Sequence, residues 1–126
     1  MRKTVSPVLL PPVFLALLCA SCDFRKADEN RPLSEVRIEA ERLDLEGLRA
    51  KAEAYKEALE ARLEEVARLR KKIEDIQLKD ILGEKGKQIG REIEELSKSV
   101  DALRTRFSIY YEKLKEVGGD LTGLAL

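Results

Sequence analysis

The sequence predicts an all-α protein built as a long antiparallel helical hairpin or coiled coil. Charged residues make up 38% of the 126-residue chain and aromatic residues only 5%, a composition that suits elongated helices better than a thick globular core. No proline occurs after position 32, and strong helix formers dominate from there on. Apolar residues then recur at alternating steps of three and four, which is the spacing of a coiled-coil seam.

The first 21 residues have the three parts of a secretory signal. A basic start, Arg2-Lys3, precedes an apolar run over residues 8–18, and the small residues Ala20-Ser21 end the segment. The apolar run is shorter than the roughly 20 residues that a transmembrane helix needs, and Pro11-Pro12 would interrupt such a helix. Residues 1–21 are therefore expected to form a cleavable signal peptide rather than a membrane span.

Cys22 makes this signal more specific. Leu18-Cys19-Ala20-Ser21-Cys22 resembles the lipobox of bacterial lipoproteins, although Cys19 stands where that family usually has leucine. The resemblance implies that Cys22 carries a diacylglycerol and becomes the N-terminus after cleavage. Two or more acyl chains hold a protein firmly to a bilayer, so the lipid bilayer is the first expected partner. The alternative is a plain secretory signal cut before Cys22, which would leave an unpaired thiol.

The residues after the cysteine bear on location and on the start of the helices. Asp23 resembles the inner-membrane retention signal of enterobacterial lipoproteins. The expected location is the bacterial cell envelope, lipid-anchored and facing the periplasm or the surface, with inner-membrane retention as one option. Residues 22–31 are almost devoid of apolar residues beyond Phe24 and are expected to form a lipidated N-terminus and flexible tether. Pro32 suits the first turn of a helix, with Asn30 as a candidate cap.

One long helix is expected over residues 32–82. Arg62 is the polar member of its seam, and we expect its stem to pack while its head reaches water; the alternatives are stacking on Phe107 or fixing the register. The stripe at residues 33–43 is out of phase with this seam and is a candidate contact surface for a partner. The apolar seam positions are Leu45, Leu48, Ala52, Tyr55, Leu59, Val66, Leu69, Ile73 and Ile76.

A second helix is expected over residues 87–117, after a turn at residues 83–86. Gly83 suits the end of the first helix because it takes a positive φ without penalty. The alternative is one continuous helix in an oligomeric coiled coil. The second seam consists of Ile89, Ile93, Leu96, Val100, Leu103, Phe107, Tyr110, Leu114 and Val117.

Charge pairing favours the hairpin over the continuous helix, which in a parallel homodimer would oppose Lys51 to Lys56. A register that places Leu59 against Tyr110 opposes no like charges, whereas a shift by one heptad opposes basic residues to each other. The flanking ion pairs of this register are Glu65–Arg106 and Lys51–Asp120.

Residues 118–126 follow a helix end at Gly118-Gly119 and are expected to form a loose tail. The alternative is that Leu121, Leu124 and Leu126 dock this tail onto the helices.

No residue pattern indicates chemistry. Acidic and basic residues alternate, as in Glu64–Arg68, which is typical of a solvated helix face rather than of a catalytic or metal site. The glycines near the turn lack the strand and the spacing of a phosphate loop. Histidine is absent and the formal charge is zero, so neither an imidazole metal site nor a basic nucleic-acid face is expected. We expect that the chain is not an enzyme, binds no cofactor, and binds neither nucleic acid nor a small-molecule substrate.

The function expected from these features is that of a membrane-anchored extracytoplasmic lipoprotein, a non-enzymatic structural or protein-interaction coiled coil. Two helices alone make a thin core, so a homo-oligomer or a helical protein partner is expected. The alternative is a periplasmic chaperone-like or assembly subunit whose helices bind client proteins. A hydrolase accessory to the envelope would need a pocket with convergent polar groups, which a two-helix coil does not provide.

Overall fold

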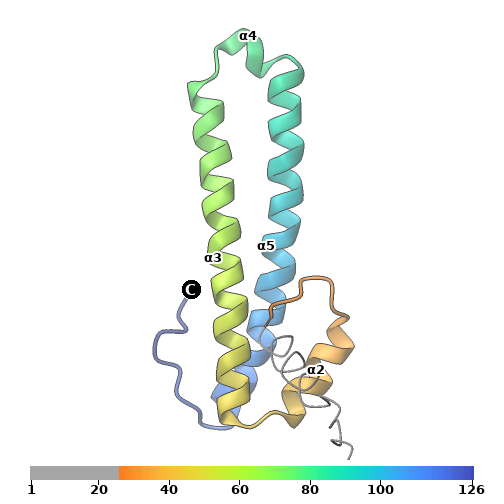
Figure 1. Ribbon diagram of the computed structural model, residues 1–126, viewed down its shortest axis with the longest axis vertical. Helices are drawn as coiled ribbons and strands as arrows, with labels where there is room; N and C mark the ends of the chain where they lie inside the picture. Colours follow the sequence, from red (N-terminus) through yellow and green to blue (C-terminus); the bar gives the residue numbers. More distant parts are fainter. Residues whose placement is uncertain (1–25) are drawn as a thin grey trace, which may run out of the picture.

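The computed structural model describes residues 26–126 as a tall hairpin with a short helix beside its base (Figure 1). The hairpin consists of α3 (Leu45–Asp75) and α5 (Glu84–Glu116), which run antiparallel and pack against each other. The short α4 (Leu78–Ile81) joins them at the tip, and α2 (Leu33–Arg42) packs against α5 near the base. The described residues contain no strand, and the two long helices fold back on each other. The predicted all-α hairpin is therefore confirmed, and the alternative of one continuous helix is wrong.

The helix expected over residues 32–82 is divided into three. The backbone is extended at Leu43 and Asp44, and the Asp44 carboxylate accepts a hydrogen bond from the Gly47 N–H at 2.8 Å. This cap satisfies an N–H that would otherwise lack a partner at the start of α3. A second extended residue, Ile76, ends α3 before the tip. The first break falls where the apolar stripe changes phase, and it lets α2 turn that stripe toward the hairpin.

The connection at the tip also differs from the expected turn at residues 83–86. α5 begins at Glu84 rather than at residue 87, and α4 supplies the reversal instead. Gly83 has a φ of −95°, so the expected positive φ is wrong. The glycine that the tip does require is Gly86, where an added Cβ would lie 1.9 Å from the Ile81 carbonyl oxygen. Close backbone approach, not a left-handed conformation, therefore requires a glycine at this end of the hairpin.

The register of the hairpin is offset from the expected one. Tyr110 stacks on Tyr55 with ring centroids 5.6 Å apart, whereas the expected register placed it against Leu59. Tyr55 and Leu59 are one helical turn apart, so the offset between α3 and α5 is about one turn. A slip of this size keeps the same seam face in contact, which is why the heptad pattern alone did not distinguish the two registers.

The ion pair expected between Glu65 and Arg106 is not formed. Glu65 pairs with Arg62 on its own helix at 3.3 Å, and Arg106 instead donates to backbone carbonyls. The Arg62 side chain is 40% exposed. The prediction that its head reaches the surface is therefore confirmed.

The buried core is concentrated in the base half of the molecule, by which we mean residues 26–62 and 99–126. The distal half is residues 63–98. No described residue between Leu69 and Val100 is buried. The stripe at residues 33–43, expected as a surface for a partner, instead covers the molecule's own core. The central core residues are Val36 and Ala40 of α2, Leu48, Ala52, Tyr55 and Leu59 of α3, and Leu103, Phe107, Tyr110 and Leu114 of α5.

Residues 118–126, which we call the tail, lie beside α3 (Figure 1) rather than hanging loose. Leu124 is fully buried in the core, and Leu121 packs partly against it. Leu126 remains 63% exposed. The chain reverses at Gly118, whose φ of 75° favours glycine. The loose-tail prediction is therefore wrong: of the three candidate docking leucines, Leu124 and in part Leu121 contact the core, and Leu126 does not.

Candidate functional site

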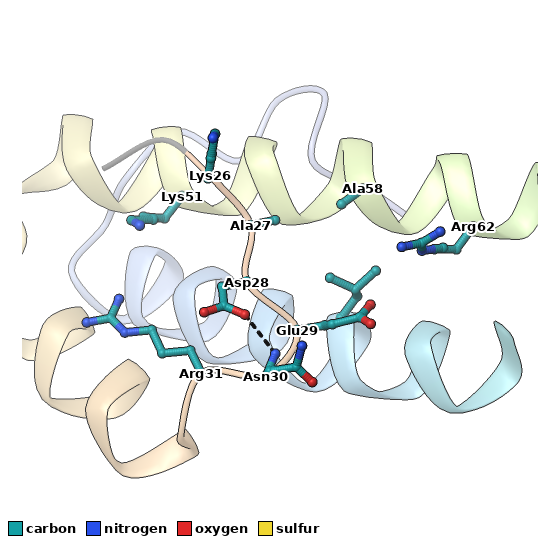
Figure 2. Close-up of a pocket in the computed structure, with 10 residues that line it drawn as sticks. Lys26, Ala27, Asp28, Glu29, Asn30, Arg31, Lys51, Ala58 and Arg62 are labelled. Atoms are coloured by element: carbon teal, nitrogen blue, oxygen red, sulfur yellow. Dashed lines mark hydrogen bonds between the residues drawn. The ribbon is translucent and has the colours of Figure 1, made fainter. Parts of the chain in front are cut away.

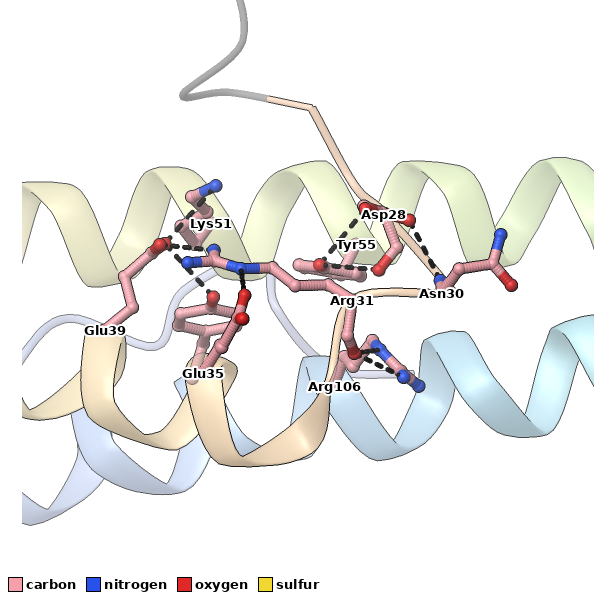
Figure 3. Close-up of polar contacts among 9 residues, drawn as sticks. Asp28, Asn30, Arg31, Glu35, Glu39, Lys51, Tyr55 and Arg106 are labelled. Atoms are coloured by element: carbon pink, nitrogen blue, oxygen red, sulfur yellow. Dashed lines mark hydrogen bonds and ion pairs between the residues drawn. The ribbon is translucent and has the colours of Figure 1, made fainter.

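A short arm, residues 26–31, crosses the base half before α2 begins (Figure 3). The hydroxyl of Tyr55 accepts a hydrogen bond from the Asp28 N–H at 3.2 Å and donates to the Asp28 carbonyl at 3.1 Å. The guanidinium of Arg106 donates to the Arg31 carbonyl through two nitrogens, at 2.6 and 3.1 Å. The flexible tether expected here is instead bonded to both long helices over its described part.

Glu39 of α2 is the centre of a polar cluster beside this arm (Figure 3). Its carboxylate is hydrogen-bonded to the Arg31 guanidinium, lies 3.3 Å from the Lys51 ammonium, and accepts from the Tyr110 hydroxyl at 3.1 Å. Burial disfavours the charged form of Glu39, but the hydrogen bond from Arg31 and the charge of Lys51 together outweigh it. The net effect lowers the pKa of Glu39, which is therefore ionised at neutral pH.

The two stacked tyrosines complete the cluster. Burial, followed by the negative charge of Glu39, raises the pKa of Tyr110, and burial also raises the pKa of Tyr55. Both hydroxyls are therefore protonated at neutral pH and act as donors. Within residues 26–126, no buried side-chain nitrogen or oxygen lacks a hydrogen-bond partner. The cluster is thus a satisfied polar joint that fixes the arm and α2 to the hairpin.

A groove of about 650 Å³ lies between the arm and α3 (Figure 2). Charged groups of both signs line it, among them Lys26, Glu29, Lys51 and Arg62. The Glu29 carboxylate is also hydrogen-bonded to the hydroxyl of Ser99 on α5. The described lining residues also include the carboxylate of Asp28 and the guanidinium of Arg31, but no histidine, cysteine, serine or threonine.

Two basic residues of α3 hold the tail in place. Arg49 donates to the carbonyls of Asp120 and Thr122 at 2.7 and 2.6 Å, and Lys56 donates to the Gly123 carbonyl at 2.7 Å. Arg49 also lies 3.8 Å from the Asp120 carboxylate. The ion pair expected between Lys51 and Asp120 is therefore replaced, because Lys51 faces Glu39 and Arg49 takes the tail.

Two grooves run between α3 and α5 in the distal half. The wide groove has a volume of about 540 Å³ and is lined by Leu63, Val66, Ala67, Arg70, Lys71 and Glu74 of α3 and by Ser97, Val100 and Asp101 of α5. The narrow groove has a volume of about 240 Å³ and includes Glu65, Lys72, Glu92 and Leu96. Neither arm nor tail residues are among the lining of these grooves.

The tip carries the most exposed large apolar side chains. Leu78 in α4 is 74% exposed and Leu82, just after it, is 76% exposed. Ile76 and Ile81 beside them are only partly buried. Apolar side chains gathered at the end of a projecting hairpin form a candidate protein-contact surface.

Cys22, predicted from the lipobox-like run, and Asp23, predicted as a sorting residue, lie outside the described residues, as do residues 1–21, which are predicted to form the signal peptide. In residues 26–126, no group of His, Cys, Asp and Glu side chains is arranged to hold a metal ion. Within the same range, no helix has the length and apolarity to cross a membrane.

No family model matches the chain, and no curated protein or solved structure matches it significantly.

Sequence reasoning missed the cluster around Glu39 and Lys51. A signal was present, because Tyr55 and Tyr110 occupy seam positions and a buried tyrosine hydroxyl requires a polar partner. Glu39 is also the sequence neighbour of Ala40, which belongs to the apolar stripe of α2. Only the folded arrangement brings these residues within hydrogen-bonding distance.

Proposed function

We propose that this protein is a lipid-anchored lipoprotein of the bacterial cell envelope and that its hairpin is a non-enzymatic protein-interaction arm. Lipid on Cys22 would attach the chain to a bilayer, with Asp23 favouring the inner membrane. Export would place the remainder outside the cytoplasm, and the contacts within the base half would make it a rigid projection.

The observation that carries this proposal is the docking of the arm. Residues 26–31 follow Cys22 closely and are bonded to Tyr55 and Arg106 in the base half. An anchor at Cys22 would therefore hold the base near the bilayer while the tip stands away from it. From Tyr55 to Asp75, α3 extends about 30 Å at 1.5 Å per residue, which is enough to present the tip beyond the lipid headgroups.

The non-enzymatic part of the proposal rests on the character of the polar groups. The Tyr55 hydroxyl is bonded to the Asp28 carbonyl and the Tyr110 hydroxyl to Glu39. These polar groups therefore stabilise the fold rather than face a substrate. The grooves of the distal half are lined by apolar and oppositely charged side chains, which suits contact with another helix.

The test is to express the full-length chain in a bacterium with labelled palmitate, beside a Cys22→Ala variant, and to fractionate the cells. We expect label and membrane association in the wild type and loss of both in the variant. A Cys19→Ala variant is the matched control and should keep the label, because Cys19 would be removed with the signal. An unlabelled wild-type protein in the soluble periplasmic fraction would refute the anchor.

The exposed leucines at the tip favour a second candidate, a chaperone-like or assembly subunit that binds client proteins. This candidate is tested by the aggregation of a thermally unfolded test protein. Suppression by the wild type that is lost on Leu78→Ser and Leu82→Ser substitution would support it. Equal behaviour of wild type and variant would exclude the tip as a client-binding surface.

A further inference from the structure

The wide groove is the uncovered continuation of a surface that the protein covers with its own tail. Arg49 and Lys56, which bind the tail, lie on the same face of α3 as Leu63 and Arg70, because each follows the last by one heptad. The tail ends beside the base half, and no described segment covers this face beyond it. Leu63 is 43% exposed there.

The narrow groove has a parallel relation to the arm. Lys51 and Ala58 line the groove beneath the arm, and Glu65 and Lys72 line the narrow groove one and two heptads further along the same face. Each face of the hairpin is thus covered in the base half and open in the distal half. The wide groove is the larger of the two and has the more apolar α3 wall, with Leu63, Val66 and Ala67.

Charge is divided between the two helices of the distal half. Residues 68–72 of α3 contain four basic and no acidic residues, and residues 92–95 of α5 contain three acidic and no basic residues. Because Tyr55 stacks on Tyr110 in an antiparallel hairpin, residues an equal number of positions after Tyr55 and before Tyr110 lie at the same height. By this count the two blocks lie at nearly the same height. No ion pair joins residues 63–76 to residues 89–103; the acidic block pairs only with Lys98 of its own helix.

We propose that the wide groove binds a second copy of this chain, so that two distal halves form a parallel four-helix bundle with both tips at the same end. A two-fold axis along the hairpin places α3 of each copy against α5 of the other. Arg70 and Lys71, the members of the basic block that line the wide groove, then face the acidic block of the partner at the same height. All four neighbouring helix pairs are antiparallel, as in an up-and-down bundle.

The opposite orientation is disfavoured by the same charges. With the tips pointing in opposite directions, α3 would face α3 and α5 would face α5, so each block would meet its own sign. Like charges opposed across a helix interface destabilise it. The parallel arrangement also leaves both arms at one end, which agrees with two anchors in one bilayer. The proposed dimer rests on the hairpin's role in protein interaction under the proposed function, but it does not require the lipid.

The parallel pair brings further apolar surface together. The two α4 turns lie side by side, where Leu78 and Leu82 are exposed. Ala67 and Ser97 are short side chains that admit close approach of helices along the wide groove. In the base halves the two tails intervene, so the helices there diverge.

The test is disulfide cross-linking between two differently tagged full-length chains co-expressed in a bacterium. One chain carries Ala67→Cys and the other Ser97→Cys, both at exposed positions of the wide groove. We expect a species bearing both tags in cell lysates after mild oxidation, and much less of it between chains without added cysteines. Lys72→Cys with Glu92→Cys, across the narrow groove, is the matched control and should not link.

Several results would overturn this pairing. Absence of the Ala67–Ser97 link, or a stronger link across the narrow groove, excludes the wide groove as the interface. Efficient linking between two Arg70→Cys chains would indicate the antiparallel orientation and would also contradict the proposed parallel pairing.

Charge reversal provides a second test at the same interface. Arg70→Glu in the Ala67→Cys chain should reduce the linked species about two- to fivefold by opposing Glu94 of the other chain. Glu94→Arg in the Ser97→Cys chain should then restore it. A reduction that Glu94→Arg fails to reverse would show that these two residues do not face each other.

These outcomes are separable from those of the palmitate experiment. A linked pair with unlabelled Cys22 removes the anchor and keeps the bundle. Labelled Cys22 with no link removes the bundle and keeps the anchor.

Discussion

The base half and the distal half of the hairpin are built from the same heptad seam, yet only one of them is a closed core. In the base half, Tyr55, Leu59 and Tyr110 are each at most 1% exposed. In the distal half, Val66 and Leu69 near the boundary are 6% and 8% exposed, whereas Ile73, Ile93 and Leu96 occupy equivalent seam positions further along and are only partly buried. The difference comes from α2, the arm and the tail, which cover the base half and end before the distal half begins.

The comparison shows that a two-helix seam does not bury its own side chains completely. A residue in such a seam contacts one neighbouring helix and is exposed at both edges. Additional segments close those edges in the base half, and they are held there by specific polar contacts to Glu39, Arg106 and Arg49. The distal half has the same apolar spacing without those segments, which leaves its edges open to a partner.

The largest expected effect compares one leucine from each half. Leu59→Ala, at a side chain 1% exposed, should lower the free energy of unfolding by about 3–4 kcal/mol. Leu96→Ala, at a partly buried position in the narrow groove, should lower it by only about 1 kcal/mol, because less apolar surface is lost. Urea denaturation followed by circular dichroism measures both. Equal losses would mean that the distal seam is as closed as the base.

The next effect compares ion pairs in the two halves. Glu39→Ala removes the carboxylate that pairs with Arg31 and with Lys51, whose side chain is 4% exposed, and should destabilise the fold by about 2–3 kcal/mol. Lys87→Ala removes an exposed pair with Glu84 and should leave stability unchanged, because such pairs contribute little in water. The same denaturation assay decides. A Glu39→Ala protein as stable as the wild type would show that the cluster does not stabilise the base.

The tail provides a smaller and more local difference. Leu124→Ala, at a fully buried side chain, should lower stability by about 2 kcal/mol and increase proteolysis after residue 117. Leu126→Ala, at a side chain 63% exposed, is the matched control and should behave as the wild type. Limited proteolysis read by mass spectrometry distinguishes them. Rapid cleavage of the wild-type tail would argue that it is undocked in solution.

Acid pH should weaken the base through Glu39. Its folded-state pKa is lowered below the ordinary value of 4.5, so its stabilisation is present above that value and is lost as pH falls through the lowered pKa. The stability difference between wild type and Glu39→Gln should therefore shrink on acidification below about pH 4.5. Chemical denaturation at a series of pH values measures this difference. A difference that stays constant down to pH 2 would contradict the assignment.

The smallest expected effect separates two glycines near the tip. Gly90→Ala meets nothing within 4 Å and should stabilise α5 by up to about 1 kcal/mol. Gly86→Ala should destabilise the tip, because its Cβ would lie 1.9 Å from the Ile81 carbonyl oxygen and the backbone would have to move. Thermal unfolding compares the two. Similar midpoints for both variants would show that α4 does not pack on α5 as described.

The candidate site divides between what a pattern reveals and what a fold assembles. The lipobox-like run ending at Cys22 is a local signal, so the anchor was predictable without a structure, and it stays a prediction. For the cluster around Glu39, the seam tyrosines indicated that a polar partner was needed. Which residues supply it was not predictable, since Arg31, Lys51 and Tyr110 belong to segments far apart in sequence. The distal grooves follow from the absence of covering segments, which no local pattern specifies.

The sequence by itself determined the all-α class, the two long helices and their shared seam, because helix propensity and heptad spacing act over neighbouring residues. It also marked a change of phase near Leu43, where the helix in fact breaks. Tertiary structure decided the register that stacks Tyr55 on Tyr110, the inward turn of α2 and the burial of Leu124. Those outcomes depend on which distant surfaces meet, and the free energy of that choice lies in packing and in satisfied buried polar groups rather than in local spacing.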